Sequence, residues 1–286
     1  MPKRLALAHD TTPLARSTER PVARPGPDGA LVEAIDHVVV EEPLEIRLGG
    51  EAIAVTMRTP GDDFELAAGF LFTETAIRSN ADIARIAFSQ RAEDKERRNV
   101  VEVTPAAGVV VDADKAKRSF YAASSCGLCG KATLDAIEVK VARLGRKDDG
   151  TVFPVEVLRG LPDAMRAAQR TFASTGGLHA AALFDATGAL IVVREDIGRH
   201  NATDKVIGHR LIAGATPCRG QALLVSGRAG FEIVQKAAVA RIPLVAAVSA
   251  PSSLAIDLAQ RLGITLVAFL RPPSAGIYSH PWRVLA

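Results

Sequence analysis

The 286-residue chain has only three cysteines, and it lacks long runs of basic or of apolar residues. Three cysteines do not form a disulfide framework in a chain of this size, which favours a reducing compartment. No Lys/Arg-rich run interleaved with aromatic residues is present, and the net charge is only +3. Nucleic-acid binding is therefore not indicated.

Sequence signals for export or membrane insertion are also missing. Lys3 and Arg4 are not followed by a sustained apolar core, so no signal peptide is predicted. The apolar run from Leu244 to Val248 is far too short to span a bilayer. We therefore expect a cytoplasmic protein with no membrane partner.

The residue pattern divides the chain into three parts. Residues 1–30 contain scattered prolines and arginines without hydrophobic periodicity, which predicts a flexible leader. Residues 31–115 contain short apolar stretches, typical of a smaller strand-rich N-terminal region. Residues 116–286 contain all three cysteines, including the Cys126 and Cys129 pair, and an alternation of strand and helix patterns, which predicts an α/β domain.

Several elements of these parts can be predicted individually. Gly49-Gly50 lies between two alternating stretches and predicts a hairpin, because such a turn needs positive φ angles. Asp62 or Asp63 is expected to cap a helix that runs to Leu71. The sequence also predicts two pairs of strands, 83–88 with 100–103 and 178–184 with 190–193, and a helix over 163–172 that ends at Gly176-Gly177.

The last third of the chain predicts a βαβαβ unit. Short apolar strands at 223–225, 243–248 and 264–269 alternate with helical patterns that start at Phe231 and after Ser252. This alternation predicts a buried parallel sheet with right-handed crossovers. In such sheets ligands bind at the carboxyl ends of the strands.

Cys126 and Cys129 lie in a glycine-rich turn before an amphipathic segment, 131–144, that is expected to be helical. A helix N-terminus favours the thiolate, which is the nucleophilic form of cysteine. We therefore interpret the pair first as a site of sulfur chemistry. Half of a zinc site, a thioredoxin-like dithiol and a purely structural role are alternatives, although no second Cys-x-x-Cys or paired-histidine motif completes a zinc site.

Two segments are candidate anion sites at the predicted strand ends. Ser226, Gly227 and Arg228 form a turn between a strand and a helix, where backbone N–H groups and a guanidinium suit phosphate. The second segment starts at the end of the last predicted parallel strand and consists of Phe269, Leu270, Arg271, Pro272, Pro273 and Ser274. Two arginine-bearing loops at one sheet edge would suit a ligand with several phosphates.

The densest polar patch, residues 194–201, follows a strand and opens a helix, where active-site groups are commonly held. Arg194 and Asp196 are its candidate ligand-binding residues, with helix capping and surface ion pairs as the alternative. His179 is a further candidate, although a buried structural histidine is more common. Cys218 is expected to be structural.

Five blocks of the sequence together resemble the FdhD family of formate dehydrogenase accessory sulfurtransferases. These blocks are Ser125–Gly130, Ser174–His179, Arg194–Asn201, Ser226–Ala229 and Val248–Ser253. They occur in this order, and the similarity extends from about Ala30 to the C-terminus, so it is much more specific than any single motif.

The resemblance implies a cytidine-deaminase-like α/β fold, a homodimer and a role as a sulfur carrier. In that role an L-cysteine desulfurase supplies sulfane sulfur, which passes to the molybdenum bis(molybdopterin guanine dinucleotide) cofactor before the cofactor enters formate dehydrogenase. The cofactor is a bound substrate here, and no permanent cofactor or metal is expected. The resemblance maps the persulfide onto Cys126, with Cys129 as its partner, and the cofactor loop onto Phe269–Ser274.

Two other functions are considered beside this one. A non-catalytic chaperone that binds the cofactor and formate dehydrogenase would use the cysteines only structurally. A zinc-dependent deaminase is suggested by the implied fold, but the His-x-Glu and Pro-Cys-x-x-Cys pattern of those enzymes is absent. The sulfur carrier is therefore the expected function.

Overall fold

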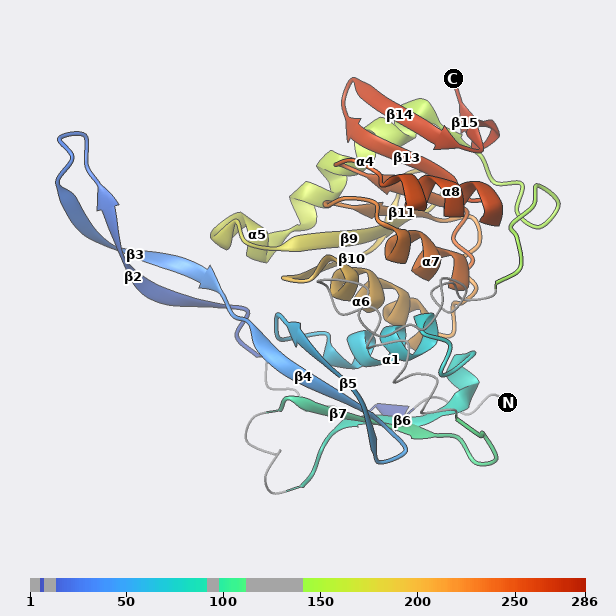
Figure 1. Cartoon of the computed structure of the whole chain (residues 1–286), viewed down its shortest axis with the longest axis horizontal. Helices are drawn as coiled ribbons and strands as arrows, with labels where there is room; N and C mark the ends of the chain where they lie inside the picture. The colour runs from blue at the N-terminus through green and yellow to red at the C-terminus, as the bar shows by residue number, and fades with distance from the viewer. Residues whose placement is uncertain (1–5, 8–13, 92–97, 112–140) are drawn as a thin grey trace.

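The computed structural model describes residues 6–7, 14–91, 98–111 and 141–286 (Figure 1). Its two large sheets have two helices, α1 (Asp63–Thr73) and α6 (Arg199–Ile212), packed between them. A paired-strand arm projects from this body. Within the described residues, no helix has both the length and the apolar character needed to cross a membrane. The structure confirms the α/β class.

The N-terminal sheet has five strands in the order β1-β6-β7-β4-β5. Their bounds are β1 Ala6–Leu7, β4 Glu42–Leu48, β5 Glu51–Arg58, β6 Ile83–Phe88 and β7 Val100–Pro105. Gly49 and Gly50 join β4 to β5 with φ angles of 62° and 89°, which confirms the predicted hairpin turn. The predicted pairing of β6 with β7 is also confirmed.

The C-terminal sheet has six strands in the order β10-β9-β11-β12-β13-β14. Their bounds are β9 His179–Phe184, β10 Leu190–Asp196, β11 Ala222–Val225, β12 Leu244–Ala247, β13 Thr265–Arg271 and β14 Ser274–Ser279. The three central strands β11, β12 and β13 are parallel, as predicted, and β9 pairs antiparallel with β11. The sheet therefore has one carboxyl edge shared by three parallel strands.

Helices cover both faces of this sheet, as Figure 1 shows. The crossover helices α7 (Phe231–Val239) and α8 (Ser253–Leu262) lie with α6 on one face, and α4 (Val155–Ala168) lies on the other. Ser252 caps α8 as predicted, because its hydroxyl accepts a hydrogen bond from the Ala255 backbone N–H at 3.2 Å. The main apolar core is continuous from the N-terminal sheet through α1 and α6 to this face.

Two glycines allow α1 and α6 to cross in direct backbone contact. A Cβ added to Gly69 would lie 1.9 Å from the Asp204 carbonyl oxygen, and one added to Gly208 would lie 1.8 Å from the Glu65 carbonyl oxygen. No side chain larger than hydrogen fits at either position. The two sheets are therefore joined by a pair of helices whose backbones are in van der Waals contact.

Two predictions from the first half of the chain differ from the structure. The prolines of residues 1–30 do not prevent regular structure, because β2 (Ser17–Pro25) pairs antiparallel with β3 (Leu31–Val39) to form the arm. Prolines are tolerated in a strand whose N–H groups face solvent. Asp62 occupies the N-cap position of α1, but its side chain makes an ion pair with Arg16 at 2.6 Å instead of capping the helix.

Two helix predictions in the second half are also wrong in their bounds. The helix expected over 163–172 begins at Val155 and contains Pro162, and after Gln169 a separate short helix, α5 (Arg170–Thr175), follows. Gly176 ends α5 in the left-handed conformation, as expected. Of the helix expected over 131–144, the last four residues are not helical, and the remainder lies outside the described residues.

The remaining short elements complete the description. They are β8 Phe153–Pro154, β15 Val284–Leu285 and two 3-10 turns, Asn80–Asp82 and Pro281–Arg283.

Candidate functional site

A cavity of about 620 Å³ opens at the carboxyl edge of the C-terminal sheet. It is lined by side chains from α4, from α5, and from the residues just after β11 and β12. The residues that line it include Arg166, Gln169, Phe172, His179, Ser226 and Val248. The cavity thus lies where ligands are expected in a parallel sheet, and its volume is in the range of small-molecule sites.

The turn after β11 is fixed to β9 by a reciprocal pair of hydrogen bonds. The Ser226 N–H donates to the Ala180 carbonyl at 2.9 Å, and the Ser226 hydroxyl accepts from the Ala180 N–H at 2.9 Å. Two further backbone bonds join Ala229 to the segment after β12. The loops at the carboxyl ends of β11 and β12 are therefore held together as one surface.

His179 stands beside this turn at the start of β9. A Cβ added to Gly227 would lie 3.3 Å from the His179 Nδ1 atom and 3.8 Å from the Arg199 Cδ atom, so only glycine leaves the space open. Burial lowers the pKa of His179, and the positive charges of Arg199, His200 and Arg228 lower it further. His179 is consequently a neutral imidazole at pH 7 in a site of positive potential.

The second arginine-bearing segment ends at the same edge. The Arg271 Nε atom donates to the Val248 carbonyl at 3.1 Å, which places its guanidinium next to a residue that lines the cavity. Phe269 is 44% exposed and has a φ angle of 51°, whereas Leu270 is completely buried in the core. The structure therefore brings Arg271, Arg228 and His179 to one edge, and it turns Leu270 away from it.

Asp196 is fully buried and holds the backbone between β10 and α6. One carboxylate oxygen accepts from the Gly198 N–H at 2.8 Å and from the Asn201 side chain at 3.0 Å. The other pairs with the Lys205 ammonium at 2.7 Å and accepts from the Thr59 N–H at 3.2 Å. Asp196 thereby fixes the N-terminus of α6, and no oxygen is left free for a ligand.

Arg194 is engaged in the same junction between the two sheets. Its guanidinium makes two hydrogen bonds to the Glu65 carboxylate, at 2.6 and 2.8 Å, and lies 3.2 Å from the His209 Nδ1 atom. Hydrogen bonding and the charge of Glu65 raise the pKa of Arg194 despite its burial. The structure thus places Arg194 and Asp196 in structural ion pairs, and direct ligand contact by either stays a prediction.

The break between α4 and α5 supplies cavity residues that the sequence did not reveal. Gln169 is buried there, and its amide nitrogen has no partner among the described residues. The Arg166 guanidinium stacks on the Phe172 ring at 4.0 Å. Because the sequence pattern predicted one helix across this break, nothing in it pointed to these side chains as part of a site.

The α5 helix is fixed to β10 by a single carboxylate. Glu195 accepts hydrogen bonds from the backbone N–H groups of Thr171 at 3.0 Å and Phe172 at 2.7 Å. A buried carboxylate at a helix N-terminus is favoured by the helix dipole. Glu195 therefore positions one wall of the cavity, a role that the sequence analysis did not assign.

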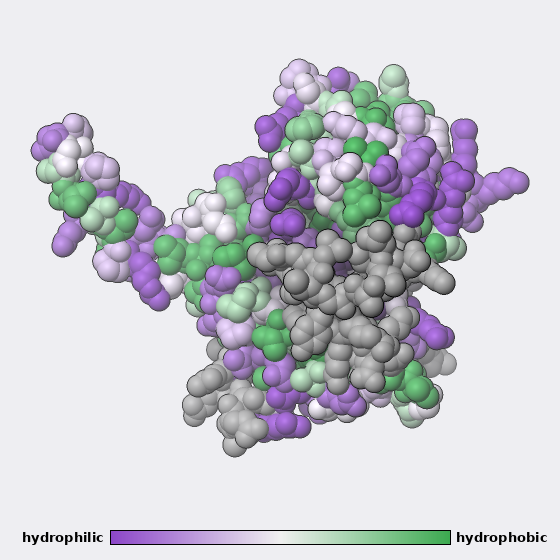
Figure 2. Space-filling model, in the orientation of Figure 1, coloured by the Kyte–Doolittle hydropathy of each residue, from purple (hydrophilic) through white to green (hydrophobic). Residues whose placement is uncertain are grey.

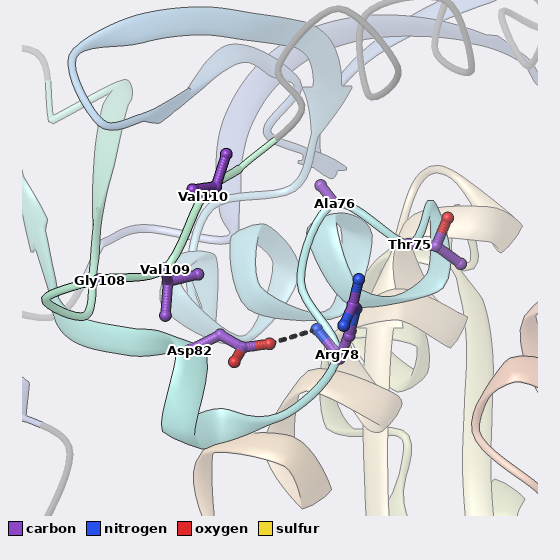
Figure 3. A pocket seen from close by; sticks show the side chains of 7 residues that line it. All are labelled: Thr75, Ala76, Arg78, Asp82, Gly108, Val109 and Val110. Carbon is purple, nitrogen blue, oxygen red and sulfur yellow. Dashed lines mark hydrogen bonds between the residues drawn. The ribbon is translucent and has the colours of Figure 1, made fainter.

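Cys126 and Cys129 lie outside the described residues. The chain leaves the described part after Val111, beside a second cavity of about 570 Å³ whose lining includes Thr75, Arg78 and Val110. Figure 3 shows Asp82 at the base of this cavity, where its carboxylate accepts a hydrogen bond from the Arg78 backbone N–H at 2.7 Å.

The chain returns along the amino edge of the C-terminal sheet. The Leu144 N–H donates to the Leu262 carbonyl at 2.7 Å, and Arg241 donates to the Ala142 carbonyl. Cys218 is buried, and burial raises the pKa of its thiol to about 11, in agreement with a structural role.

The chain was compared with known proteins. Residues 39–285 match the model of the FdhD/NarQ family. The sulfur carrier protein FdhD of Streptomyces avermitilis is 50% identical over 95% of this chain and 97% of its own length. The protein of the same name from Mycolicibacterium paratuberculosis is 51% identical over 90% of this chain and 94% of its own length.

A solved structure gives the same result for the fold. The crystal structure of a protein described as a formate dehydrogenase accessory protein, from Desulfotalea psychrophila, superimposes with a TM-score of 0.72. That protein is 26% identical in sequence, and the alignment covers 95% of this chain and all of the other. The family match over most of the sequence, together with relatives at about 50% identity, leads to one conclusion: the chain belongs to the FdhD/NarQ family.

Proposed function

We propose that this protein is a sulfur carrier that takes sulfane sulfur onto Cys126 and delivers it to a guanine dinucleotide form of the molybdenum cofactor. The membership in the FdhD/NarQ family supports this function, and the relatives at about 50% identity are named sulfur carrier proteins. The observation that carries the proposal is the presence of a Cys-x-x-Cys pair in the sequence together with a cavity at the carboxyl edge of the sheet, beside which the exposed Arg228 and Arg271 lie.

The sheet edge beside the cavity carries side chains that can bind the phosphates of a nucleotide. His179, Arg228 and Arg271 lie at one edge, and the Arg228 and Arg271 side chains are exposed. Arginine suits phosphate because its guanidinium is always charged and can donate two parallel hydrogen bonds. The cofactor is the substrate of this reaction, and its guanosine diphosphate end would occupy this edge.

The sulfur transfer is a thiolate exchange. The Cys126 thiolate attacks the terminal sulfur of a cysteine desulfurase persulfide, a new S–S bond forms on Cys126, and the desulfurase cysteine leaves as a thiolate. The persulfide sulfur is then passed on by a second nucleophilic step. If Cys129 attacks Cys126, hydrosulfide leaves and a disulfide remains, which a cellular dithiol must reduce before the next cycle.

The partners follow from this chemistry. An L-cysteine desulfurase is the donor. Formate dehydrogenase is the final recipient, in line with the description of the solved relative as a formate dehydrogenase accessory protein. We place the reaction in the cytoplasm, where the thiols stay reduced.

Mass spectrometry tests the carrier step. After incubation with a desulfurase and cysteine, the peptide that contains Cys126 is expected to gain one sulfur atom, and Cys126→Ala is expected to gain none. Cys218→Ala is the matched control, because it removes a thiol that is buried and protonated. An adduct that persists in Cys126→Ala would contradict the relay.

Complementation separates the carrier from a non-catalytic chaperone. In cells that lack the protein, Cys126→Ala is expected to leave formate dehydrogenase inactive. Restored activity with this variant would favour the chaperone.

Calorimetric titration with guanosine diphosphate tests whether the nucleotide binds at this sheet edge. Arg228→Ala and Arg271→Ala are each expected to weaken binding by about 10-fold or more, the usual loss for one hydrogen bond to a charged group. Gly227→Ala is expected to weaken binding as well, because its Cβ would lie 3.3 Å from His179. Unchanged affinity in all three variants would place the nucleotide elsewhere.

A further inference from the structure

The amino edge of the C-terminal sheet is the end of the sheet opposite the cavity. Residues 141–152 cross this edge, and Figure 1 shows them, in yellow-green, on the side of the sheet away from α5. The Leu144 N–H donates to the Leu262 carbonyl at the end of α8, at 2.7 Å, and the Asp149 carboxylate accepts from the Gly220 N–H at 2.9 Å. The segment is therefore a fixed part of this edge.

Six basic residues from four separate parts of the chain gather at this edge. Three lie in the segment 141–152, one lies before β11, one lies before β12, and one lies in the 3-10 turn before β15. They are Arg143, Arg146, Lys147, Arg219, Arg241 and Arg283, and we call them the basic edge. With Asp148 and Asp149, six bases and two acids give a net charge of +4, whereas the whole chain has a net charge of +3. Figure 2 shows hydrophilic residues projecting from this side of the molecule.

Arg219 and Arg241 are held against the segment 141–152. Each donates to one of its carbonyl groups, Arg219 to that of Asp148 and Arg241 to that of Ala142. Burial lowers the pKa of Arg241, and the positive charge of Arg219 lowers it further, so the two guanidinium groups lie close to each other. The segment therefore fixes these two charges in place and concentrates them.

Arg283 adds a buried charge beneath the same surface. Its side chain is completely buried, and its Nη1 atom donates to the Gly263 carbonyl at 2.8 Å. Its Nε and Nη2 atoms have no partner among the described residues. Burial lowers the pKa of Arg283, and the charge of Asp149 offsets this only in part. Because a buried charge is screened less by salt than an exposed one, Arg283 strengthens the positive potential of the edge.

The chain itself does not neutralise these charges. Within the residues that the structure describes, no member of the basic edge makes an ion pair with a carboxylate, whereas Arg24 and Arg159 each do so elsewhere on the surface, at 2.8 and 2.6 Å. The helices α7 and α8 end at this edge, and cations are favoured at helix C-termini. This accounts for Arg241, which follows α7, but not for the three bases in the segment 141–152.

We propose that the basic edge is the docking surface for a protein with an acidic face, and that this protein is the cysteine desulfurase that donates the sulfur. The inference rests on the proposed function. Its location agrees with the sequence, because the segment that contains Cys126 rejoins the described chain at residue 141, at this edge. A donor bound here lies at the opposite end of the strands from the cavity, so donor and cofactor can be bound at the same time.

Complementary charge acts before the two proteins touch. A surface of one sign attracts a partner of the opposite sign from a distance and raises the association rate, and this effect falls as the salt concentration rises. Exposed charges contribute mainly to association, because water screens them once the complex has formed. The basic edge is therefore expected to control the rate of association more than the rate of dissociation.

A nucleic acid fits this edge less well than an acidic protein does. Single-stranded nucleic acids bind by stacking their bases on exposed aromatic rings. The aromatic ring at the edge, that of Trp282, is already engaged by two guanidinium groups, with Arg146 at 5.2 Å and Arg283 at 4.0 Å from the ring centre. The exposed Asp148 would also repel a phosphate. The chemistry of the edge thus favours carboxylates on a protein surface.

The test is the association of the full-length protein with immobilised cysteine desulfurase, measured by biolayer interferometry at low and at high salt. The double variant Arg143→Glu/Lys147→Glu changes two exposed side chains that make no hydrogen bond or ion pair within the described structure, so the fold is expected to stay intact. Its association rate constant is expected to fall roughly 10-fold at low salt and by less at high salt.

A matched variant separates the position of the charges from the net charge of the protein. Arg85→Glu/Arg91→Glu makes the same change in net charge at two exposed residues of the N-terminal region, in β6 and just after it. This variant is expected to bind the desulfurase as the wild type does. An equal loss of association in both double variants would show a general charge effect and would overturn the proposal.

Loading of Cys126 provides a second readout. Inorganic polysulfide supplies sulfane sulfur without a docking surface, so Arg143→Glu/Lys147→Glu is expected to take up this sulfur as fast as the wild type. Its loading by the desulfurase is expected to be roughly 10-fold slower. A variant that loses both routes equally would be impaired at Cys126 itself, which would contradict a docking role.

Two further results would overturn the proposal. One is an Arg143→Glu/Lys147→Glu variant that associates with the desulfurase at low salt as fast as the wild type. The other is a single-stranded RNA that binds the wild type and not this variant, while desulfurase binding stays the same in both. Association requires no reaction at Cys126, so failure of this proposal and failure of the proposed function can be told apart.

Discussion

The backbone contact between α1 and α6 predicts that a glycine-to-alanine substitution at the crossing lowers the stability of the protein strongly. In Gly208→Ala, the new Cβ would lie 1.8 Å from the Glu65 carbonyl oxygen, 2.7 Å from the Glu65 carbonyl carbon and 2.8 Å from the Gly69 nitrogen. All three are backbone atoms, so no rotamer change relieves the overlap. The helices must separate by more than about 1 Å, which opens the core on both sides of the crossing.

The expected change in the free energy of unfolding is the difference between two opposing effects. Alanine in a helix interior is favoured over glycine by about 1 kcal/mol. Overpacking of a close-packed interior costs about 1–3 kcal/mol and sometimes more, and here the whole helix must move. We expect Gly208→Ala to lower the free energy of unfolding by about 2 kcal/mol, the upper end of the overpacking cost less the gain in helix propensity, measured as a lower midpoint of urea unfolding.

A matched glycine in another helix provides the control. Gly160 lies within α4, and a Cβ added there would meet no atom within 4 Å. Gly160→Ala is therefore expected to keep or raise the unfolding midpoint, because only the helix propensity changes. If Gly208→Ala unfolds at the same or a higher urea concentration than the wild type, the close crossing does not hold the two sheets together as described.

Three ionisable groups, two of them buried and His179 partly buried, give further predictions. Lys205→Met leaves the buried Asp196 carboxylate without its counter-charge, so the free energy of unfolding is expected to fall by about 3–5 kcal/mol, and an Asp196→Asn change in the same chain should restore part of it in urea titrations. The Cys218 thiol, with a pKa of about 11, is expected to resist iodoacetamide at pH 8 until the protein unfolds, and rapid native labelling would contradict its burial. The lowered pKa of His179 means that the unfolded chain binds this proton more readily than the folded one, so stability should fall as the pH drops through the ordinary value of 6.5; a His179→Gln variant should lose that part of the pH dependence in thermal unfolding.

The sequence was most informative where local rules are strict. The turn at Gly49-Gly50 was predictable because only glycine adopts two consecutive positive φ angles without strain. The parallel strands were predictable from short apolar runs, since a sheet buried on both faces excludes polar residues. Ser252 was predictable as a cap because its hydroxyl competes for free N–H groups at a helix start.

The sequence failed where long-range contacts override local preference. The prolines of β2 suggested an irregular leader, yet they pair with residues of β3 such as Leu31 and Ile35. Pro162 suggested a helix start, yet the helix begins before it at Val155. Such outcomes depend on partners distant in sequence, which a local pattern cannot identify.

The candidate site was predictable only in part. The turn Ser226–Arg228 and the segment Phe269–Ser274 could be placed at one sheet edge, because parallel strands have a common direction. The contribution of Gln169 could not be predicted, because it depends on a break between two helices. The structural role of Asp196 could not be predicted either, because its partners Lys205 and Thr59 come from two other segments.

The close crossing of α1 and α6 limits how far the two sheets can move relative to each other. A hinge between the two sheets would have to pull apart backbone atoms already in contact at Gly69 and Gly208, and it would also break the ion pair that joins Arg194 to Glu65. Opening by domain rotation is therefore disfavoured. A movement of α5 relative to α4 costs less free energy, because one carboxylate, that of Glu195, holds this six-residue helix in place. We therefore expect a ligand to enter the cavity beside α5.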